Sequence, residues 1–287
     1  MALSYKPFRS VLYIPGSRLK AIEKARNLPA DVLIFDLEDA VLPDEKDSAR
    51  SEIARAMHAG FGNRTSILRI NALSSEWGIW DAQSATQIGV DAVALPKVEQ
   101  AADLDELADI TGDLAIWAMI ETPLGVLNAA QIAAHPRLEG LIVGSNDLIK
   151  DLGARARADR LQLIASLSQC ILAARAHGKI AIDAVFNAYR DLDGLRAEAE
   201  QGRDLGFDGK TVIHPGQLEI VNEVFGLSAA ELHLAQRQIV AFESAKSKEQ
   251  GVAVLDGQIV EELHAAAAQR QIDRAKAIAE IERGWHM

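Results

Sequence analysis

Short runs of apolar and β-branched residues recur along the chain, and each is followed by a stretch in which apolar positions have helical spacing. Short apolar runs bounded by polar or turn-forming residues are typical of buried strands. Eight runs fit this description, at residues 11–14, 32–35, 66–70, 92–95, 115–120, 141–143, 180–182 and 211–213. The pattern therefore predicts eight strands.

Amphipathic segments separate these runs, among them residues 18–27, 46–58, 101–110, 160–177 and 194–205. Strict alternation of strand and helix predicts a parallel sheet with right-handed crossovers. Eight such units indicate an α/β fold, the closed (β/α)8 TIM barrel. An open, doubly wound sheet is the alternative. Against it, the turn at residues 15–18, Pro-Gly-Ser-Arg, lacks the Gly-x-Gly-x-x-Gly phosphate fingerprint.

The chain continues well beyond the eighth run. Ser228 and Glu231 have the spacing of a capping box and predict a helix that runs toward Lys248. We interpret the glycine-punctuated residues 251–257 as a hinge before a final helix at about 259–282, whose apolar face needs cover from the barrel or a neighbouring subunit. We therefore predict two parts, a catalytic barrel at residues 1–225 and a C-terminal helical extension or lid at residues 226–287.

The composition is that of a soluble globular protein, with 49% hydrophobic and 25% charged residues. A net charge of -11 argues against nucleic acid or an anionic membrane as partner, because either would need a basic surface. We find no secretory signal and no apolar stretch of about 20 residues that could span a membrane. The single cysteine, Cys170, is expected to be buried and suits a reducing compartment. We therefore expect a cytoplasmic protein.

Two carboxylates lie where predicted strands end. Glu121 follows the run at 115–120, and Asp147 comes shortly after the run at 141–143. The carboxyl ends of the strands form the active site of a TIM barrel, and two carboxylates there can bind one hard cation. The sequence thus predicts a Mg²⁺ site at Glu121 and Asp147. The alternative is that each residue is a helix N-cap or a surface acid.

Further charged residues fall at the same predicted end of the barrel. Asp36, Glu38 and Asp39 follow the second run, and crowded like charges need compensation by a cation or by solvent. Arg69 ends the third run, and its planar guanidinium suits two-point binding of a carboxylate or an enolate oxygen. A structural ion pair with one of the three acids is the alternative. Lys97 is either a ligand contact or a plain surface lysine.

Three more basic or titratable groups follow the first and last strands. Arg18 and Lys24 are candidate phosphate anchors at the barrel rim. His214 could act as a base, although a buried and hydrogen-bonded histidine is the favoured interpretation.

A metal, an arginine and additional carboxylates suit enolate chemistry. Magnesium would polarise the oxygen on which negative charge develops, and Arg69 would share that charge. A carboxylate with a raised pKa could move the proton. The sequence contains no serine or cysteine nucleophile elbow, so covalent acyl chemistry has no support.

The motifs resemble, in order, those of the HpcH/HpaI aldolase and citrate lyase superfamily, in its branch of citrate lyase beta subunits and malyl-CoA lyases. The resemblance runs from about Arg9 to the end of the chain. It is carried by residues 11–18 (VLYIPGSR), 36–41 (DLEDAV), 69–71 (RIN), 95–97 (LPK), 120–123 (IETP), 144–148 (GSNDL), 206–210 (GFDGK) and 213–215 (IHP).

This resemblance implies a TIM barrel that forms a homotrimer or hexamer, with Mg²⁺ bound by Glu121 and Asp147. It implies that Arg69 binds the carboxylate of the acid half of the substrate. The other substrate-binding residues that it implies are Tyr13, Arg18 and Lys24, which would contact coenzyme A, and Ser145, Asn146 and Asp147, which would act through backbone amides.

Two departures from the family pattern bear on the reaction. Aldolases of the superfamily that act on free pyruvate carry a histidine base where this chain has Asp39, so the chain is similar to the CoA-thioester branch. Lyases of that branch carry an aspartate on the C-terminal lid, which acts on a neighbouring subunit's site. The matching residue here is Glu261, longer by one methylene. We expect Asp39, Arg69 and Glu261 to be the catalytic groups.

The resemblance implies a Mg²⁺-dependent enzyme acting on a short hydroxy-dicarboxyl-CoA thioester of the malyl-CoA type. The favoured hypothesis is a carbon–carbon lyase that releases acetyl-CoA and glyoxylate. A (3S)-malyl-CoA thioesterase using the same site is a close alternative. Two others are a citrate lyase beta subunit that works on an acyl-carrier-protein thioester and a barrel that only binds a ligand.

Overall fold

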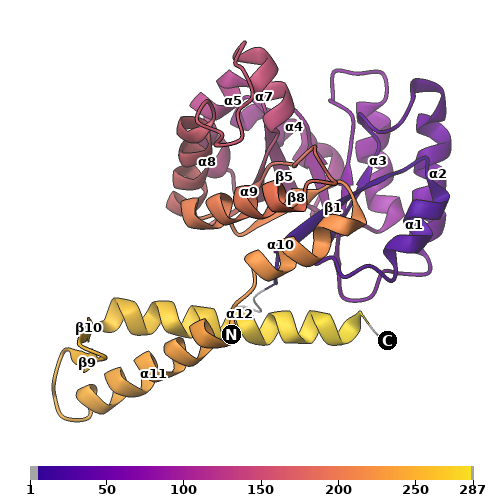
Figure 1. The fold of residues 1–287 in the computed structure, drawn as a ribbon. Coiled ribbons are helices and arrows are strands. Elements are labelled where there is room, and N and C mark those ends of the chain that lie inside the picture. The colour runs from indigo at the N-terminus through magenta and orange to yellow at the C-terminus, as the bar shows by residue number, and fades with distance from the viewer. Residues whose placement is uncertain (1–5, 286–287) are drawn as a thin grey trace. The chain divides into compact units, whose positions relative to one another are not determined.

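Eight parallel strands form a closed barrel in the computed structural model, which describes residues 6–285 (Figure 1). The strands follow one another in chain order, and β1 pairs with β8 to close the sheet. The predicted TIM barrel is confirmed. The strands are β1 (Ser10–Pro15), β2 (Val32–Asp36), β3 (Thr65–Arg69), β4 (Ala92–Leu95), β5 (Ala115–Ile120), β6 (Leu138–Val143), β7 (Ile180–Asp183) and β8 (Gly209–Val212).

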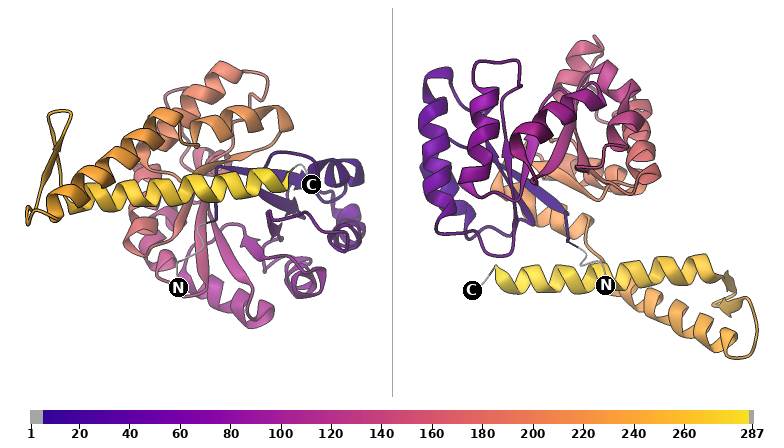
Figure 2. Two further views of the ribbon diagram at one scale, coloured as in Figure 1. Left: turned by 90° about the horizontal axis from the view of Figure 1, so that it is seen from below. Right: turned by 180° about the vertical axis from the view of Figure 1, so that it is seen from behind.

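Helices connect the strands and surround the barrel (Figure 2). Apolar residues that face outward from the strands pack against these helices, while a smaller cluster fills the barrel interior. Phe8 and Trp117 belong to the interior cluster, with ring centroids 5.4 Å apart. The helices are α1 (Leu19–Ala25), α2 (Lys46–Met57), α3 (Gly78–Ile88), α4 (Ala101–Thr111), α5 (Pro123–Leu127), α6 (Ala129–Ala133), α7 (Ser145–Asp151), α8 (Ile164–Ala176), α9 (Leu192–Leu205) and α10 (Leu218–Val224), with 3-10 turns η1 (Pro43–Glu45) and η2 (Pro215–Gln217).

Two strands begin two or three residues before their predicted starts, because their first residues include polar ones or glycine. β6 begins at Leu138, so Glu139 and Gly140 belong to it. The Glu139 carboxylate accepts a hydrogen bond from the Trp117 indole at 3.0 Å. β8 includes Lys210, which is fully buried. Hydropathy alone does not indicate a strand at these positions.

The described chain divides into two compact units. Phe8–Phe225 contains the barrel, and the second unit comprises the chain from Gly226 onward together with Lys6 and Pro7. The second unit contains α11 (Ala229–Lys246), β9 (Ala253–Leu255), β10 (Gln258–Val260) and α12 (Glu262–Gly284). The capping box at the start of α11 is confirmed, since the Ser228 hydroxyl accepts the Glu231 N–H at 3.2 Å and the Glu231 carboxylate accepts the Ser228 N–H at 2.8 Å.

The segment interpreted as a hinge is an antiparallel hairpin. Asp256 and Gly257 connect β9 to β10, and both have positive φ, 51° and 78°. An Asp-Gly pair in this conformation makes a two-residue hairpin turn that matches the twist of the strands. Consequently the final helix, predicted from about residue 259, begins three residues later, at Glu262.

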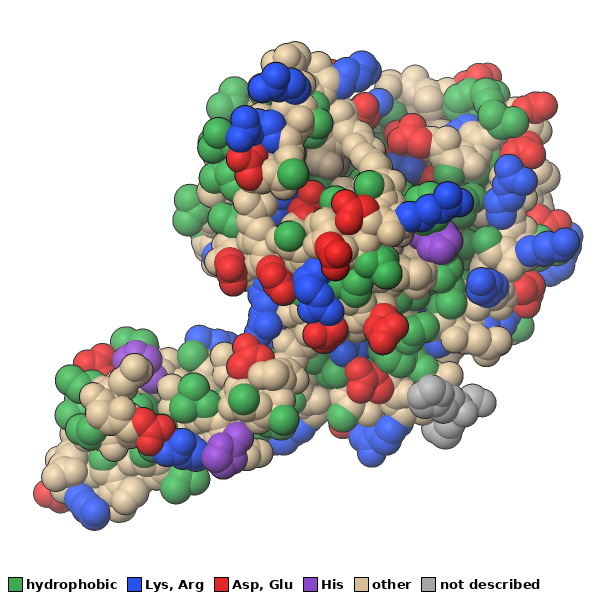
Figure 3. All heavy atoms as spheres, in the orientation of Figure 1, with side chains coloured by type: hydrophobic (Ala, Val, Ile, Leu, Met, Phe, Trp, Pro, Cys, Tyr) green, Lys and Arg blue, Asp and Glu red, His purple; other side chains and the backbone are tan. Residues whose placement is uncertain are grey.

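Apolar side chains are exposed on this second unit. Val254 and Ile259 are cross-strand partners and are 69% and 60% exposed, and Leu263 at the start of α12 is 62% exposed. Figure 3 shows hydrophobic side chains (green) among charged ones on the visible face. No helix in the described part of the chain has the length and apolar content to cross a bilayer.

Candidate active site

A cavity of about 330 Å³ lies at the carboxyl ends of the barrel strands. This is the end of a TIM barrel at which active sites form. Five of the charged residues that the sequence singled out line it, namely Asp36, Asp39, Arg69, Glu121 and Asp147. The lining consists of Tyr13, Pro15, Asp36, Asp39, Ala40, Arg69, Met119, Glu121, Val143, Gly144, Ser145, Asn146, Asp147, Val185, Asn187 and Ile213.

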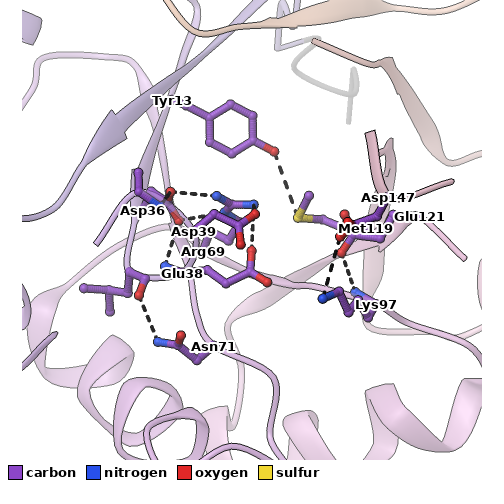
Figure 4. A network of polar contacts seen from close by, with 12 residues as sticks. Tyr13, Asp36, Glu38, Asp39, Arg69, Asn71, Lys97, Met119, Glu121 and Asp147 are labelled. Carbon is purple, nitrogen blue, oxygen red and sulfur yellow. Dashed lines mark hydrogen bonds and ion pairs between the residues drawn. The ribbon is translucent and has the colours of Figure 1, made fainter. Parts of the chain in front are cut away.

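Arg69 is held in a fixed orientation by acids at the end of β2 and in the turn that follows it (Figure 4). Its Nε and Nη2 donate to the two carboxylate oxygens of Asp36 at 2.7 and 2.6 Å. Its Nη1 lies 2.7 Å from the Glu38 carboxylate and 3.5 Å from that of Asp39. The structural ion pair that the sequence left as an alternative is therefore present. It does not remove Arg69 from the cavity, because the guanidinium still lines it.

Asp36 is saturated by its partners. Besides Arg69, its carboxylate accepts the backbone N–H groups of Glu38 and Ala40 at 2.9 and 3.2 Å. The side chain is 1% exposed. A carboxylate with this many charge-assisted hydrogen bonds is a positioning group for Arg69 and has little capacity left for a ligand.

Glu38 has a strongly raised pKa. Burial raises the pKa of Glu38 to about 7, and the nearby carboxylates of Asp39, Glu121 and Asp36 add to the rise, while Arg69 opposes it. Its Oε2 makes no hydrogen bond of good geometry although Arg69 is close. The three-acid turn therefore contains one carboxyl group that titrates near neutral pH.

The Tyr13 ring packs against the Arg69 guanidinium. The Arg69 Cζ lies 4.9 Å from the centroid of the Tyr13 ring, a cation–π arrangement. The Tyr13 hydroxyl points toward the Met119 sulfur at 4.0 Å (Figure 4). Burial raises the pKa of Tyr13, so this hydroxyl stays protonated and can donate into the cavity.

Glu121 and Asp147 come together on the opposite wall, from the ends of β5 and β6 (Figure 4). Neither is an N-cap, because Thr122 caps α5 and Gly144 precedes α7. Glu121 is 5% exposed, and its Oε1 accepts the Lys97 backbone N–H at 2.8 Å. Burial raises the pKa of Glu121, and the Lys97 hydrogen bond and Arg69 partly offset this.

Lys97 contacts both of these acids. Its backbone has φ of 52°, a left-handed conformation that is unusual for a residue other than glycine. The turn directs its N–H at Glu121, and its ammonium lies 3.6 Å from the Asp147 carboxylate. Lys97 is thus not a plain surface lysine. Any ligand that it contacts has to compete with Asp147 for its ammonium group.

The donors fit a hard divalent cation. Two carboxylates supply oxygen ligands, and Mg²⁺ is commonly held by one or two carboxylates with water and substrate oxygens completing its shell. Among the described residues no group of three or more metal-binding side chains occurs, which agrees with a shell that is only partly protein. A Cβ at Gly144 would lie 2.3 Å from Oε2 of Glu121. Any residue other than glycine at 144 would therefore displace this carboxylate.

The remaining predicted residues divide into those at the cavity and those away from it. Ser145 and Asn146 line it as the first residues of α7, and Asp39 lines it with a side chain that is 73% exposed. Arg18 and Lys24 are exposed at the start and end of α1, outside the lining. Glu261 lies in the second unit as the N-cap residue of α12, where its N–H donates to Nδ1 of His264 at 3.0 Å.

The comparison with protein families decides what kind of barrel this is. Residues 9–215 match the model of the family HpcH/HpaI aldolase/citrate lyase. The chain belongs to this family. The resemblance inferred from the motifs is thereby confirmed.

Individual relatives of this family member cover nearly its whole length. It is 56% identical over 280 residues to the (3S)-malyl-CoA thioesterase of Cereibacter sphaeroides, covering 97% of this chain and 98% of that protein. It is 35% identical over 282 residues to the citrate lyase subunit beta of Leuconostoc mesenteroides, covering 94% and 93%. A crystal structure of the protein CitE from Mycobacterium tuberculosis in complex with magnesium, acetoacetate and coenzyme A has a TM-score of 0.79 at 32% identity, covering 93% and 97%.

Two further residues support the site, and no sequence pattern indicated either of them. Lys46 is buried, and its ammonium donates to the carbonyls of Leu37 and Glu38 at 2.7 and 2.9 Å and to Asn71 at 2.7 Å. It therefore holds the acidic turn in place. Asn187, from the loop after β7, donates to the Asn146 side chain at 2.7 Å and lines the cavity.

The favoured interpretation of His214 is wrong in one respect. The side chain is exposed, although it is hydrogen-bonded, because its Nδ1 accepts the Gly216 N–H at 3.0 Å. It caps η2 at the barrel rim. Cys170 is buried as predicted, and burial raises the pKa of its thiol to about 12.

Proposed function

We propose that the chain is a Mg²⁺-dependent hydrolase of (3S)-malyl-CoA or a closely similar hydroxy-dicarboxyl-CoA thioester. The observation that carries this proposal is the 56% identity with (3S)-malyl-CoA thioesterase over almost the full length of both chains. Citrate lyase beta subunits are more distant, at 35%. The alternative that the sequence left open is thus better supported than the carbon–carbon lyase that we favoured.

Glu121 and Asp147 would hold the metal ion, which when bound polarises a substrate oxygen that it coordinates. Arg69 would bind the free carboxylate of the malyl group. Its two-point grip on Asp36 fixes the plane of the guanidinium before the substrate arrives, so little orientation has to be gained on binding. Backbone N–H groups at Ser145, Asn146 and Asp147 belong to a helix first turn and are available to substrate oxygens.

Asp39 is the carboxylate that remains to activate water. Four acids line the cavity, and Asp36 is saturated by Arg69 and two N–H groups. Glu121 and Asp147 are assigned to the metal. Asp39 is exposed at the cavity and makes only a 3.5 Å contact with Arg69. It would accept a proton from water as the oxygen adds to the thioester carbonyl, after which the C–S bond breaks and the proton leaves with the thiol.

The second compact unit would act as a lid on the site of a neighbouring subunit, in a homotrimer or hexamer. The exposed apolar residues Val254, Ile259 and Leu263 support a role in contact with another chain. Glu261 would be the lid carboxylate, close to these residues in sequence. A cytoplasmic location is supported by a single, buried cysteine.

The test is to incubate the purified protein with (3S)-malyl-CoA and Mg²⁺ and to measure both sets of products. Free thiol with malate and without glyoxylate is the expected result. Glyoxylate with acetyl-CoA and without thiol would show a lyase instead. Turnover that requires added acyl carrier protein would indicate the citrate lyase type of activity, and unchanged rates with EDTA would exclude the metal.

A further inference from the structure

Four charged side chains form a buried cluster where β7, β8 and α9 meet. Lys210 is fully buried, and its ammonium lies 3.1 Å from the Asp183 carboxylate and 2.7 Å from that of Glu198. The Arg160 guanidinium lies 2.7 Å from Asp183 and 3.8 Å from Glu198. We call these four residues the charged cluster. They do not line the active-site cavity, so the proposed reaction does not use them directly.

Stability alone does not account for the charged cluster. Burial removes the hydration of all four charges, and well-packed apolar residues often replace such a group without loss of stability. The cluster also requires unfavourable backbone. Arg160 has φ of 52°, a left-handed conformation that is uncommon outside glycine. A Cβ at residue 202 would lie 2.6 Å from Oδ2 of Asp183, so α9 has glycine, a poor helix former, at this point. These features indicate a geometric role.

Lys210 also belongs to a row of buried donors that hold the loop after β7. The carbonyls of residues 183, 184 and 186 accept hydrogen bonds from Thr211 at 2.9 Å, Lys210 at 2.6 Å and Gln217 at 2.9 Å, in that order. The three donors come from β8 and η2 and are at most 1% exposed. Lys210 is the charged member of the row, and charge-assisted hydrogen bonds are the strong ones. Because the charged cluster fixes its ammonium, the ammonium fixes the Ala184 carbonyl.

The loop after β7 reaches the active site. Val185 and Asn187 line the cavity. Asn187 donates to the Asn146 side chain at 2.7 Å, and Asn146 directly precedes the proposed metal ligand Asp147 in the first turn of α7. Displacement of this loop would therefore move a side chain that contacts the metal-binding turn.

We propose that Lys210 is a positioning residue for the reaction. Held by the charged cluster, its ammonium fixes the loop after β7, and this loop keeps the first turn of α7 in place through Asn187. This rests on the proposed function, in which the N–H groups of that turn bind substrate oxygens. A misplacement of about 1 Å by a distant substitution can lower a rate by about 100-fold. The charge of Lys210 thus matters to the reaction because of the Ala184 carbonyl that it holds.

The test removes two opposite charges together, so that no buried acid is left without its cation. Lys210→Met combined with Glu198→Met leaves the Ala184 carbonyl without its charged donor. This double variant should keep a urea midpoint close to that of the wild type, while kcat/KM for malyl-CoA falls by about tenfold to 100-fold. Amide hydrogens in peptides covering residues 184–191 should exchange about tenfold faster, because a hydrogen bond from a charged group contributes at least this factor to local stability.

A kinetic cycle tests the route through Asn187. This side chain is exposed, so Asn187→Ala leaves the core intact. The substitution should lower kcat/KM by about tenfold in the wild type and by less than about twofold in the double variant, because changes that act through one contact are not additive. Equal factors in both backgrounds would overturn the proposal. Wild-type kinetics of Asn187→Ala would do the same, even if the double variant failed to fold.

Arg9 and Asp31 supply the matched control. They form a buried ion pair at 2.9 Å just before β1 and β2, at the end of the barrel opposite the cavity. Arg9→Met combined with Asp31→Asn should leave kcat/KM and the exchange of residues 184–191 unchanged. Glu198→Gln keeps an oxygen acceptor for the Lys210 ammonium, and should likewise keep wild-type kinetics.

Unchanged kcat/KM in the Lys210 double variant, or an equal loss in the Arg9 control, would overturn the proposal. Lack of turnover of malyl-CoA by the wild type would refute the proposed function instead. The exchange measurement would then still decide whether Lys210 holds the loop after β7.

Discussion

The Arg69 guanidinium binds both oxygens of the Asp36 carboxylate, with Nε 2.7 Å from Oδ1 and Nη2 2.6 Å from Oδ2. Both side chains are nearly inaccessible to solvent. A lysine ammonium has no planar pair of donors and could not reproduce this arrangement.

Arg69→Lys should therefore lower kcat/KM by about 100-fold or more, because loss of a preorganised two-point contact has this order of effect on transition-state binding. Steady-state kinetics with malyl-CoA would measure it. Arg196→Lys is the control, since Arg196 pairs with Glu223 on the surface at 2.6 Å. Equal kinetic effects of the two substitutions would contradict the role given to Arg69.

Glu38 predicts a specific pH dependence of stability. Its pKa is raised from 4.5 to about 7 by burial, so the folded state retains a proton that the unfolded state releases. The free energy of unfolding should therefore fall as pH rises from about 4.5 to about 7, by roughly 1 to 3 kcal/mol. Urea denaturation of Glu38→Gln at several pH values should show a flatter profile in this window. A profile identical to that of the wild type would exclude Glu38 as the source.

Removal of either proposed metal ligand should abolish stabilisation by magnesium. Wild-type protein should melt at a higher temperature with Mg²⁺ than with EDTA, because a ligand that binds only the folded state stabilises it. Glu121→Gln and Asp147→Asn should show no such difference. If both variants still respond like the wild type, the metal binds elsewhere.

Lys97 should compete with the metal for Asp147. Its ammonium lies 3.6 Å from that carboxylate and is half exposed, so its attraction is modest. Lys97→Met keeps the backbone N–H to Glu121 and removes the charge, and should lower the Kd for Mg²⁺ by about threefold to tenfold, or about 1 kcal/mol. Calorimetric titration would measure this, and a weaker affinity would mean that Lys97 assists the metal.

Lys210 should be among the most sensitive positions for stability. It is fully buried, and its ammonium lies 3.1 Å from Asp183 and 2.7 Å from Glu198, beside the Arg160–Asp183 pair. Lys210→Met leaves Glu198 without this cation and should cost about 3 to 5 kcal/mol of unfolding free energy. Lys276→Met, at an exposed pair with Asp273, should change it by less than about 0.5 kcal/mol.

The sequence predicts the barrel well because its strands are mostly uninterrupted apolar runs. The same logic brings Glu121 and Asp147 to one cavity, since the strand ends of a parallel barrel meet at one end. Lys210 is different, because its burial depends on Asp183 and Glu198 and no local pattern shows those partners.

The parts of the site that the sequence does not predict depend on backbone conformation and on contacts between loops. The left-handed turn at Lys97 and the contacts of Lys46 with carbonyls are of this kind. So is the Gln217 side chain that joins two loops. The hairpin at Asp256 and Gly257 did carry a local signal, because Asp-Gly between apolar residues is a common hairpin turn.

The absence of a side chain at Gly144 makes room for the Glu121 side chain. Since a Cβ at residue 144 would meet the Glu121 side chain at both Oε2 and Cβ, a larger residue at 144 requires the Glu121 side chain to move or to be replaced. A descendant that acquired alanine at 144 would have to give up the glutamate in its present rotamer, and with it one wall of the cavity. The smallest residue of the site thus sets where the largest acid of this wall can lie.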